Sequence, residues 1–359
     1  MAPTRPPHLA VALDGPARYD AHHYVALARL AERGALDFVT LGDSFARPGL
    51  DALAVLSRVA PATERIGLVP TVTTTHTEPF HVSTAVATLD WVSRGRAGWA
   101  VGVSATEAEA RLFGRRSTTP PAALWRDAGE VADGVARLWD GREDGAEFRD
   151  TSTDRLVDRD EPHHVDNRGG TFAVRGPSPL PRSPQGRPLT VIDGSAEGGR
   201  AAAARYADVV PVRAQSPEQA AAHRADVRRR AAAHGRDPDG IRVLVTLVVD
   251  LGARESAPEP GLAAGPPLAG GGPHFIGGPV DLAELIARWH GEGAADGFHL
   301  VPIAPHRDLE RIVNGTVALL QHRGSFRTFY PGGTLREHLG LARHARRHAG
   351  RPARTGGAA

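Results

Sequence analysis

Several polar side chains stand just after an apolar run of the sequence, and these are the residues best placed for chemistry. Apolar runs at 37–41, 66–72, 97–103 and 189–192 are followed in turn by Asp43, by Thr74 and His76, by Ser104 and by Ser195. Ser195 also opens a segment with helical spacing, and hydroxyl and N–H groups at a helix N-terminus form a ready phosphate site. A structural alternative exists for the others: Asp43 and Ser104 can cap the turn or helix that follows, and Thr74 can be a strand residue.

The composition excludes several kinds of chemistry. The 359 residues include no Cys and no Lys, so all 43 basic side chains are Arg. This excludes disulfides, thiolate metal sites, a cysteine nucleophile, a Schiff-base lysine and the lysine of a phosphate-binding P-loop. We expect no metal site. The remaining candidates are carboxylates, imidazoles, hydroxyls and a bound cofactor.

Charge and hydropathy limit the partners. The formal net charge is +2, with acidic residues interspersed among the arginines, and no basic stripe with interleaved aromatics indicates a nucleic-acid partner. The apolar runs are far shorter than a membrane span, and the N-terminus lacks the apolar core of a signal peptide. We therefore expect a cytoplasmic protein that binds neither nucleic acid nor membrane.

Eight short apolar runs alternate with amphipathic segments, a pattern typical of βα units around a parallel sheet. At this length, eight such units predict an α/β fold of the TIM type, an eight-stranded (βα) barrel. The alternative is an open doubly wound sheet, which favours a glycine-rich phosphate turn after the first strand. Leu13-Asp-Gly-Pro16 is followed by no such turn. The expected strands are His8–Leu13, Asp37–Leu41, Ile66–Val72, Ala97–Val103, Leu189–Ile192, Ala207–Val212, Ile241–Val249 and Gly297–Val301.

Two stretches interrupt this alternation. Residues 141–188 are polar and rich in Pro and Gly, with a hairpin expected near Asn167–Gly170, and residues 252–278 are mostly Gly, Pro and Ala. We expect both insertions to cover the C-terminal mouth of the barrel, where active sites of this fold lie. The sequence thus predicts one domain over residues 1–340 and an Arg-rich tail over residues 341–359.

Specific motifs resemble those of a known family. The segment Thr77-Glu-Pro-Phe-His-Val82, the stretch 87–99 that follows it, Leu112-Phe-Gly114, the block 181–188 and the segment 320–340 occur in collinear order. They resemble the bacterial-luciferase-like flavin monooxygenases, and within them the subgroup of nitrilotriacetate monooxygenase, dibenzothiophene-sulfone monooxygenase and the streptogramin synthase component. The resemblance covers nearly the whole chain.

The resemblance implies an eight-stranded βα barrel that uses reduced FMN, supplied by a separate flavin reductase, and dioxygen to oxygenate a small organic substrate. In such enzymes the cofactor supplies the chemistry, and the protein positions it and excludes water. By the same resemblance, Asp43, Thr74 and Ser104 match positions near the flavin, Ser195 matches a phosphate position, and His76 is assigned to the substrate pocket. A homodimer is also implied, with the segment Phe80–Val92 expected at its interface.

At four positions the sequence departs from the family pattern. Ala100 stands where the family has Asn, Pro121 and Trp125 stand where a His and a Tyr hold the FMN phosphate, and Ala196 replaces a Ser. A hydrogen bond to a charged group contributes about 1.5–3 kcal/mol. Losing two of them would weaken FMN binding about a hundredfold or more. The segment after the seventh strand is also shorter than in the family.

Three hypotheses follow. The leading one is the oxygenase component of a two-component monooxygenase that binds reduced FMN weakly, with specialised metabolism suggested by the family's range. The second is a hydride-transfer enzyme that uses another flavin, the deazaflavin cofactor. The third is a flavin-free barrel that acts as a binding protein or as a cofactor-independent enzyme built on His76 and Asp43. The sequence names neither the substrate nor the atom that is oxygenated.

Overall fold

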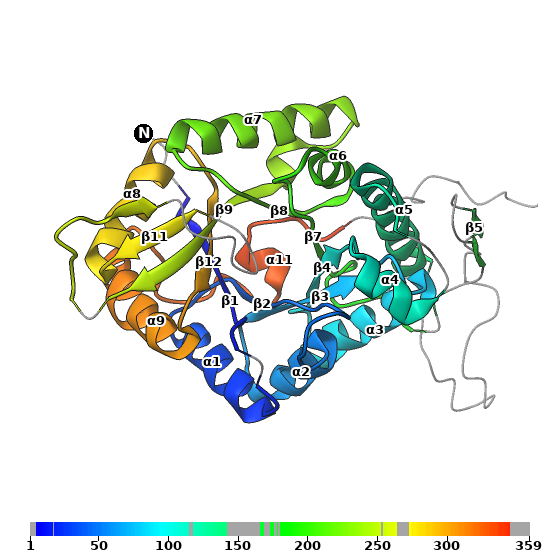
Figure 1. The fold of residues 1–359 in the computed structure, drawn as a ribbon, viewed down its shortest axis with the longest axis horizontal. Coiled ribbons are helices and arrows are strands. Elements are labelled where there is room, and N and C mark those ends of the chain that lie inside the picture. The colour runs from blue at the N-terminus through cyan, green and yellow to red at the C-terminus, as the bar shows by residue number, and fades with distance from the viewer. Residues whose placement is uncertain are drawn as a thin grey trace, which may run out of the picture.

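Eight parallel strands close into a barrel (Figure 1). The computed structural model describes residues 5–16, 18–114, 118–141, 166–168, 173–175, 178, 180–252, 254–263 and 273–344. Strand β9 pairs in parallel with β12 on one side and with β8 on the other, and this pairing closes the ring and confirms the predicted TIM barrel. The barrel strands are β1 (His8–Ala12), β2 (Phe38–Leu41), β3 (Gly67–Thr73), β4 (Gly98–Gly102), β7 (Leu189–Val191), β8 (Val209–Val212), β9 (Arg242–Leu251) and β12 (Gly297–Pro302).

Amphipathic helices surround the barrel, because each buries one apolar face against the outer side of the strands. In the first helix the apolar stripe of Tyr24, Leu27, Ala28, Leu30 and Ala31 is buried. The helices are α1 (Ala21–Arg33), α2 (Ala52–Val59), α3 (Pro79–Val92), α4 (Glu107–Phe113), α5 (Pro121–Asp140), α6 (Glu197–Tyr206), α7 (Pro217–Ala233), α8 (Pro279–Gly291), α9 (Pro305–Arg311) and α10 (Ala318–His322), with a π-helical segment at Ile312–Val317 and 3-10 turns at Ala60–Ala62 and Pro238–Gly240.

The strands bury side chains on both faces, as parallel strands under helices must. Leu9 and Val11 of β1 face the helices and belong to the large outer core, whereas Ala10 points into the barrel. Phe38 and Leu244 fill the lower interior with Leu335. The barrel is therefore packed solid near the N-terminal ends of its strands.

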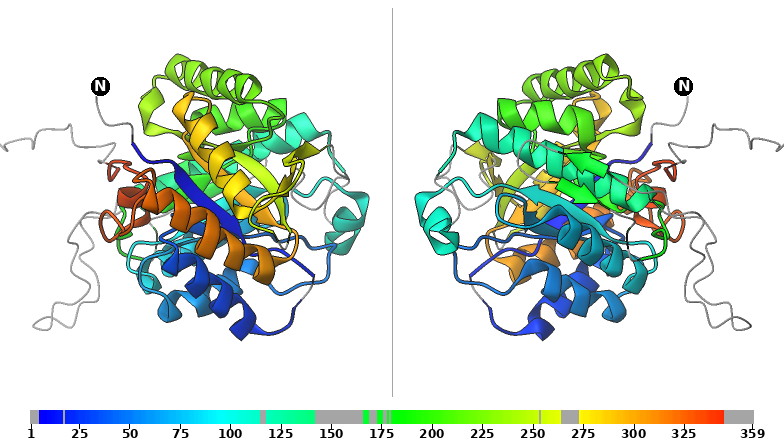
Figure 2. Two further views of the ribbon diagram at one scale, coloured as in Figure 1. Left: turned by 90° about the vertical axis from the view of Figure 1, so that its left-hand side faces the viewer. Right: turned by 90° about the vertical axis from the view of Figure 1, so that its right-hand side faces the viewer.

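The C-terminal segment closes that lower end. Helix α11 (Leu335–His338) lies inside the ring of strands in Figure 1, and Figure 2 shows the segment at the same end of the barrel as the N-terminus. Arg327 fastens it by donating to the carbonyl of Ala35 and to the carboxylate of Asp37, at 2.7 and 2.8 Å. The expected packing of the C-terminal segment on the barrel is confirmed up to residue 344, and residues 345–359 of the predicted tail lie outside the described part.

The position expected for the first insertion is wrong where the structure describes it. Residues 180–188 pack at the N-terminal end, where Ser183 and Gln185 donate to the carboxylate of Asp90 near the end of α3. The reason is topological: this segment leads from the end of a helix into the start of β7, and both lie at the bottom of a βα barrel. The predicted hairpin is confirmed as β5 (Asp166–Arg168) paired antiparallel with β6 (Ala173–Arg175). Most other residues of the insertion lie outside the described part.

The second insertion does lie at the C-terminal end. It carries β10 (Gly261–Ala263) and β11 (His274–Gly277), and β11 pairs with the last residues of β9, from Val248 to Leu251. These strands extend the sheet beside the end of β9, at the edge of the mouth. The described residues of the insertion do not line the cavity there. Among the described residues, no helix combines the length and the apolar character that crossing a membrane requires.

Candidate functional site at the barrel mouth

A cavity of about 260 Å³ opens at the C-terminal end of the barrel. Its walls are the upper, inward-pointing residues of the strands, and most of these are small or hydroxylated: Ala12, Thr40, Thr71, Ala100 and Thr246. The lower interior holds larger side chains, so the small residues above them leave space that a ligand can fill. A concave site of this kind, at this end of the barrel, is where TIM-barrel enzymes place their chemistry.

His299 and Thr40 form a hydrogen-bonded pair in the cavity wall. The imidazole Nε2 and the hydroxyl Oγ1 lie 2.8 Å apart. Burial lowers the pKa of His299 to about 4, although Asp193 works in the opposite direction. The imidazole is therefore neutral at physiological pH and can accept or donate one hydrogen bond toward a ligand.

Asp14, directly after β1, supplies a carboxyl group at the cavity. It accepts the backbone N–H of Gly42 at 3.0 Å. Burial raises the pKa of Asp14 above its usual range, while that hydrogen bond and the nearby Arg47 lower it. A carboxyl group with a raised pKa can hold a proton that an ordinary aspartate would release, which suits proton transfer.

Asp43 lines the same cavity. It also caps the turn that follows, which is the structural role that the sequence offered as an alternative. Its two carboxylate oxygens accept the backbone N–H groups of Ser44, at 2.7 Å, and of Ala52, at 2.9 Å. These hydrogen bonds fix the conformation of the loop between β2 and α2. Ala100 lines the same cavity.

Thr74 and Ser104 lie together at the ends of β3 and β4, and their hydroxyl groups differ. Thr74 donates its hydroxyl to the carbonyl of Gly102 at 2.9 Å, so that oxygen is committed to joining the strands. The buried hydroxyl of Ser104 has no hydrogen-bond partner among the described residues. The alternative role of Ser104 as a helix cap is wrong, because the following helix begins at Glu107 and is capped by Thr106.

The N-terminus of α6 lies beside the cavity. The helix begins at Glu197, two residues later than the sequence suggested. Ala196 is its N-cap and makes no side-chain cap bond. The Ser195 N–H donates to the carboxylate of Asp193 at 2.7 Å, and Asp193 also lines the cavity. The backbone N–H groups of the first helical turn, which follow, are the groups that bind anions at helix N-termini.

Trp125 packs directly on this helix start. A Cβ placed on Gly198 would lie 3.2 Å from the Cβ of Trp125, which is tighter than an ordinary side-chain contact. The structure therefore brings together Trp125, Ser195 and Ala196, which are far apart in sequence. Pro121, the first residue of α5, stands one helical turn before Trp125 and offers no N–H.

His76 lies on the loop after β3, outside the residues that line the cavity. Its ring stacks on Phe113 with a centroid separation of 4.3 Å and an interplanar angle of 8°. Phe45 meets both rings edge-on. This aromatic group joins the loop after β2, the loop after β3 and α4, so His76 forms part of a rim rather than of the cavity wall.

The cavity residues that the sequence did not single out include three titratable ones with candidate chemical roles, Asp14, Asp193 and His299. Asp14 and Asp193 follow their strands by two residues, which was the signal used for Asp43, and that signal could have found them. His299 is inside β12, and only the inward or outward direction of alternate strand residues distinguishes it. Arg213 forms an ion pair with Asp193 at 3.3 Å, so the mouth carries a positive and a negative side chain.

Comparison with known proteins agrees with this architecture. The family model described as luciferase-like monooxygenase matches residues 6–263. The chain is similar to component A of nitrilotriacetate monooxygenase from Aminobacter aminovorans, at 32% identity over 95% of this chain and 92% of that protein. It is also similar to the dibenzothiophene-sulfone monooxygenase of Rhodococcus erythropolis, at 29% identity over 89% of this chain and 89% of that protein.

A solved structure has the same fold. The EDTA monooxygenase of Chelativorans sp. BNC1 superimposes with a TM-score of 0.82 at 23% identity, covering 94% of this chain and 99% of that one. The family model spans well over half of the chain, and the relatives match over most of their length. This chain therefore belongs to the luciferase-like monooxygenase family of enzymes.

Proposed function

We propose that the chain is the oxygenase component of a two-component flavin monooxygenase. It would take reduced FMN from a separate reductase and use dioxygen to oxygenate a small organic substrate. The observation that carries this proposal is the continuity between the mouth cavity and the start of α6, which meet at Asp193. A flavin needs such an arrangement, a slot for the ring and a phosphate site beside it.

The residues present fit the ring of this cofactor. Small side chains such as Ala100 and Thr71 leave the upper barrel open. Ser104 is not part of this lining, and its buried hydroxyl has no hydrogen-bond partner among the described residues. When bound, reduced FMN supplies the electrons that activate dioxygen. The protein's own part is to orient the substrate, to exclude water and to hold a proton, which Asp14 can do because burial raises its pKa.

Fewer hydrogen-bond donors than in the family pattern would bind the FMN phosphate. Backbone N–H groups and the positive end of the α6 dipole remain, whereas Ala196 and Pro121 supply no side-chain donor. Asp193 and Glu197 also place negative charge near the helix start. These features favour a flavin that binds transiently and leaves, as a cofactor delivered by a diffusing carrier must, over a permanently bound one.

Two associations are part of this proposal, one with the reductase and one between two copies of this chain. The reductase needs only to deliver flavin by diffusion, so a lasting complex with it is not required. The homodimer remains a proposal that rests on the exposed apolar residues of α3, namely Phe80, Trp91 and Val92. Exposed apolar patches of this kind often mark an interface between protomers.

Binding measurements test the proposal directly. The purified protein should be colourless, and anaerobic calorimetry should show tighter binding of reduced than of oxidised FMN. The deazaflavin cofactor in the same titration tests the hydride-transfer hypothesis, since that enzyme would prefer it to FMN. Absence of binding by any reduced flavin at millimolar concentration would refute both flavin hypotheses.

The flavin-free hypothesis gains support from one observation. The mouth cavity holds its own proton-transfer groups, Asp14 with a raised pKa and neutral His299. A small ligand held between these groups could react without a cofactor. Catalysis or ligand binding that persists in flavin-depleted protein, and that is lost in Asp14→Asn, would favour this hypothesis over the flavin enzyme.

A further inference from the structure

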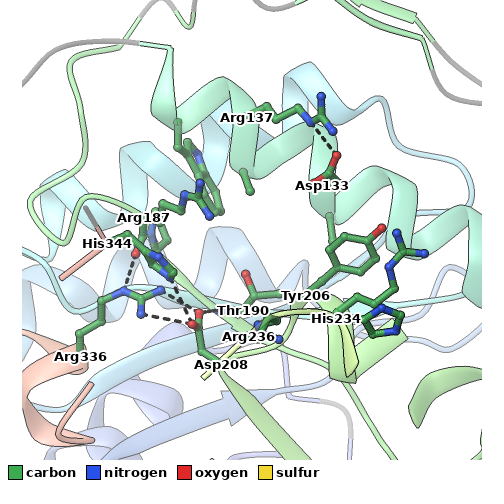
Figure 3. A pocket seen from close by; sticks show the side chains of 15 residues that line it. Asp133, Arg137, Arg187, Thr190, Tyr206, Asp208, His234, Arg236, Arg336 and His344 are labelled. Carbon is green, nitrogen blue, oxygen red and sulfur yellow. Dashed lines mark hydrogen bonds and ion pairs between the residues drawn. The ribbon is translucent and has the colours of Figure 1, made fainter. Parts of the chain in front are cut away.

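A second and larger cavity, of about 470 Å³, opens at the opposite end of the barrel from the mouth. It lies between the second half of α5, the C-terminal end of α6 and the loops that enter β7 and β8. Figure 3 shows its side chains arranged around an open centre, with Arg137 and Asp133 on the helix above and Asp208 and Arg336 below. Neither the proposed reaction nor the flavin uses this end of the fold.

The floor of the cavity is a buried, charged cluster. The Arg336 guanidinium donates to both carboxylate oxygens of Asp208, at 3.2 and 2.8 Å, and His344 Nε2 lies 3.4 Å from one of them. Burial alone would raise the pKa of Asp208, but Arg336 and His344 hold it well below its usual range. Asp208 is therefore ionised, and both of its carboxylate oxygens already have partners. It leaves no negative charge to balance other cations.

Arg236 stands beside this floor without a carboxylate partner among the described residues. It donates to the carbonyls of Ala204 and Ala207 at 3.1 and 2.7 Å, and thereby caps the C-terminal end of α6. Burial lowers the pKa of Arg236, and the nearby positive charges of Arg336 and Arg187 lower it further, while Asp208 opposes them. A half-buried guanidinium held near two others indicates a site that is short of negative charge.

The rim adds two more cations. Arg205 is exposed and lies over the ring of Tyr206, with its guanidinium carbon 5.3 Å from the ring centroid. No carboxylate of the described residues pairs with it. Arg137 pairs with Asp133 one turn away on α5, at 2.6 Å. Both side chains reach the cavity from exposed positions, so they can turn toward a ligand.

The lining sets five arginines against two aspartates. One of the five, Arg187, donates to the carboxylate of Asp140 just behind the lining, at 2.7 Å. With that pair set aside, four arginines face two aspartates, and the excess of two matches Arg205 and Arg236, the two arginines of the lining without a carboxylate partner among the described residues.

We propose that this cavity binds a small molecule with a phosphate group. Guanidinium groups match tetrahedral oxyanions with paired N–H donors, and they are the residue of choice for phosphate. A phosphate carries up to two negative charges, which would balance the excess of the lining. The volume lies in the range of small-ligand sites.

The position indicates control or stabilisation rather than catalysis. In this fold the chemistry lies at the C-terminal end, and the N-terminal end serves stability. A phosphate here would bridge α5, the end of α6 and Arg336 of α11. It would stabilise the folded state in proportion to the logarithm of its concentration over its dissociation constant.

The test is calorimetry on the full-length chain with inorganic phosphate, and separately with glycerol phosphate, at constant ionic strength in chloride. One saturable site per chain is expected, together with a higher unfolding temperature. The double substitution Arg137→Gln with Arg205→Gln should weaken binding about tenfold or more. Because both side chains are at exposed positions, these variants should fold normally.

Two matched variants locate the site. Arg58→Gln removes an exposed arginine of α2 far from the cavity, and Ser195→Ala alters the proposed flavin phosphate position; neither should change phosphate affinity. Equal affinity for both probes identifies free phosphate as the ligand, and tighter glycerol phosphate identifies a phosphate monoester. No saturable binding at millimolar concentration, binding unaffected by the arginine substitutions, or binding abolished by Ser195→Ala would each overturn the proposal.

Discussion

His299 and Thr40 are 259 positions apart, yet the Nε2 of His299 lies 2.8 Å from the Oγ1 of Thr40 inside the barrel. The two residues stand on β12 and β2, on either side of β1. Their neighbours on β1 are Ala10, in register with His299, and Ala12, in register with Thr40. Because both are alanines, nothing blocks the imidazole from reaching across the strand. The pair exists because β12, the last described strand of the chain, pairs with β1 on the side opposite β2.

The stability of the protein should fall as the pH is lowered from about 6.5 to about 4. Burial lowers the pKa of His299 and of His338 to about 4, below the ordinary value of 6.5. Between these values the unfolded chain binds more protons than the folded one, so acid favours unfolding. For His299 the loss should be ~1–2 kcal/mol, since its side chain is partly exposed.

Denaturant titrations at a series of pH values measure this effect. His299→Gln should make the fall in unfolding free energy shallower across the same window, while His338 continues to contribute. Proton NMR of the imidazoles gives an independent reading, and an ordinary pKa near 6.5 for His299 would contradict the prediction.

Ser104→Ala should separate stability from ligand binding. The Ser104 hydroxyl is buried without a described partner, so its removal should leave the unfolding free energy unchanged or raise it by up to about 1 kcal/mol. If the hydroxyl contacts the flavin, the same change should weaken reduced-FMN binding severalfold in calorimetry. Thr74→Val is the contrasting control, because it breaks the bond to Gly102 and should cost about 1 kcal/mol. A Ser104→Ala protein with unchanged flavin affinity would remove Ser104 from the proposed site.

Restoring donors at the start of α6 should tighten flavin binding. The triple substitution Pro121→His, Trp125→Tyr and Ala196→Ser adds side-chain donors where the helix N-terminus now acts almost alone. We expect reduced FMN to bind tighter by one or more orders of magnitude, as about 1.5–3 kcal/mol per charged hydrogen bond implies. Ala196→Ser alone also provides a helix cap, so its effect on stability must be measured separately by thermal unfolding. Affinity that stays the same in the triple variant would count against a phosphate site here.

Leu335→Ala should destabilise the barrel from below. Leu335 is fully buried against Phe38 and Gly67 at the bottom of the barrel. Removing its side chain should lower the unfolding free energy by about 2–5 kcal/mol, measured by chemical denaturation. Leu112→Ala, at a residue that is 65% exposed, is the control and should change it by less than about 0.5 kcal/mol. An equally small effect at Leu335 would mean that α11 does not plug the barrel.

The protein should be a homodimer in solution. Phe80, Trp91 and Val92 of α3 are each more than two-fifths exposed, which is unusual for large apolar side chains on one helix. Light scattering should give twice the chain mass of 37.9 kDa. Phe80→Glu should shift the protein toward the monomer, because a charge cannot be buried unpaired at an apolar interface. A wild-type mass near that of one chain would refute the dimer.

The sequence alone determined the order and direction of the barrel elements. The eight apolar runs and the amphipathic segments between them fall within a few residues of the observed strands and helices, because short-range periodicity reports which face of an element is buried. The family motifs predicted the monooxygenase family to which the chain belongs. Asp43 was predicted at the mouth because it follows a predicted strand, whereas Ala100 was singled out through the family resemblance.

Only the tertiary structure decided which polar groups share a space. The pairing of His299 with Thr40 depends on β12 lying beside β1, and the contact of Trp125 with Gly198 depends on how α5 packs against α6. The basic cavity at the N-terminal end gathers arginines from five separate segments, and no local pattern in the sequence connects them. Burial then sets the charge of each group, because removal from water shifts a pKa by amounts that sequence neighbours do not determine.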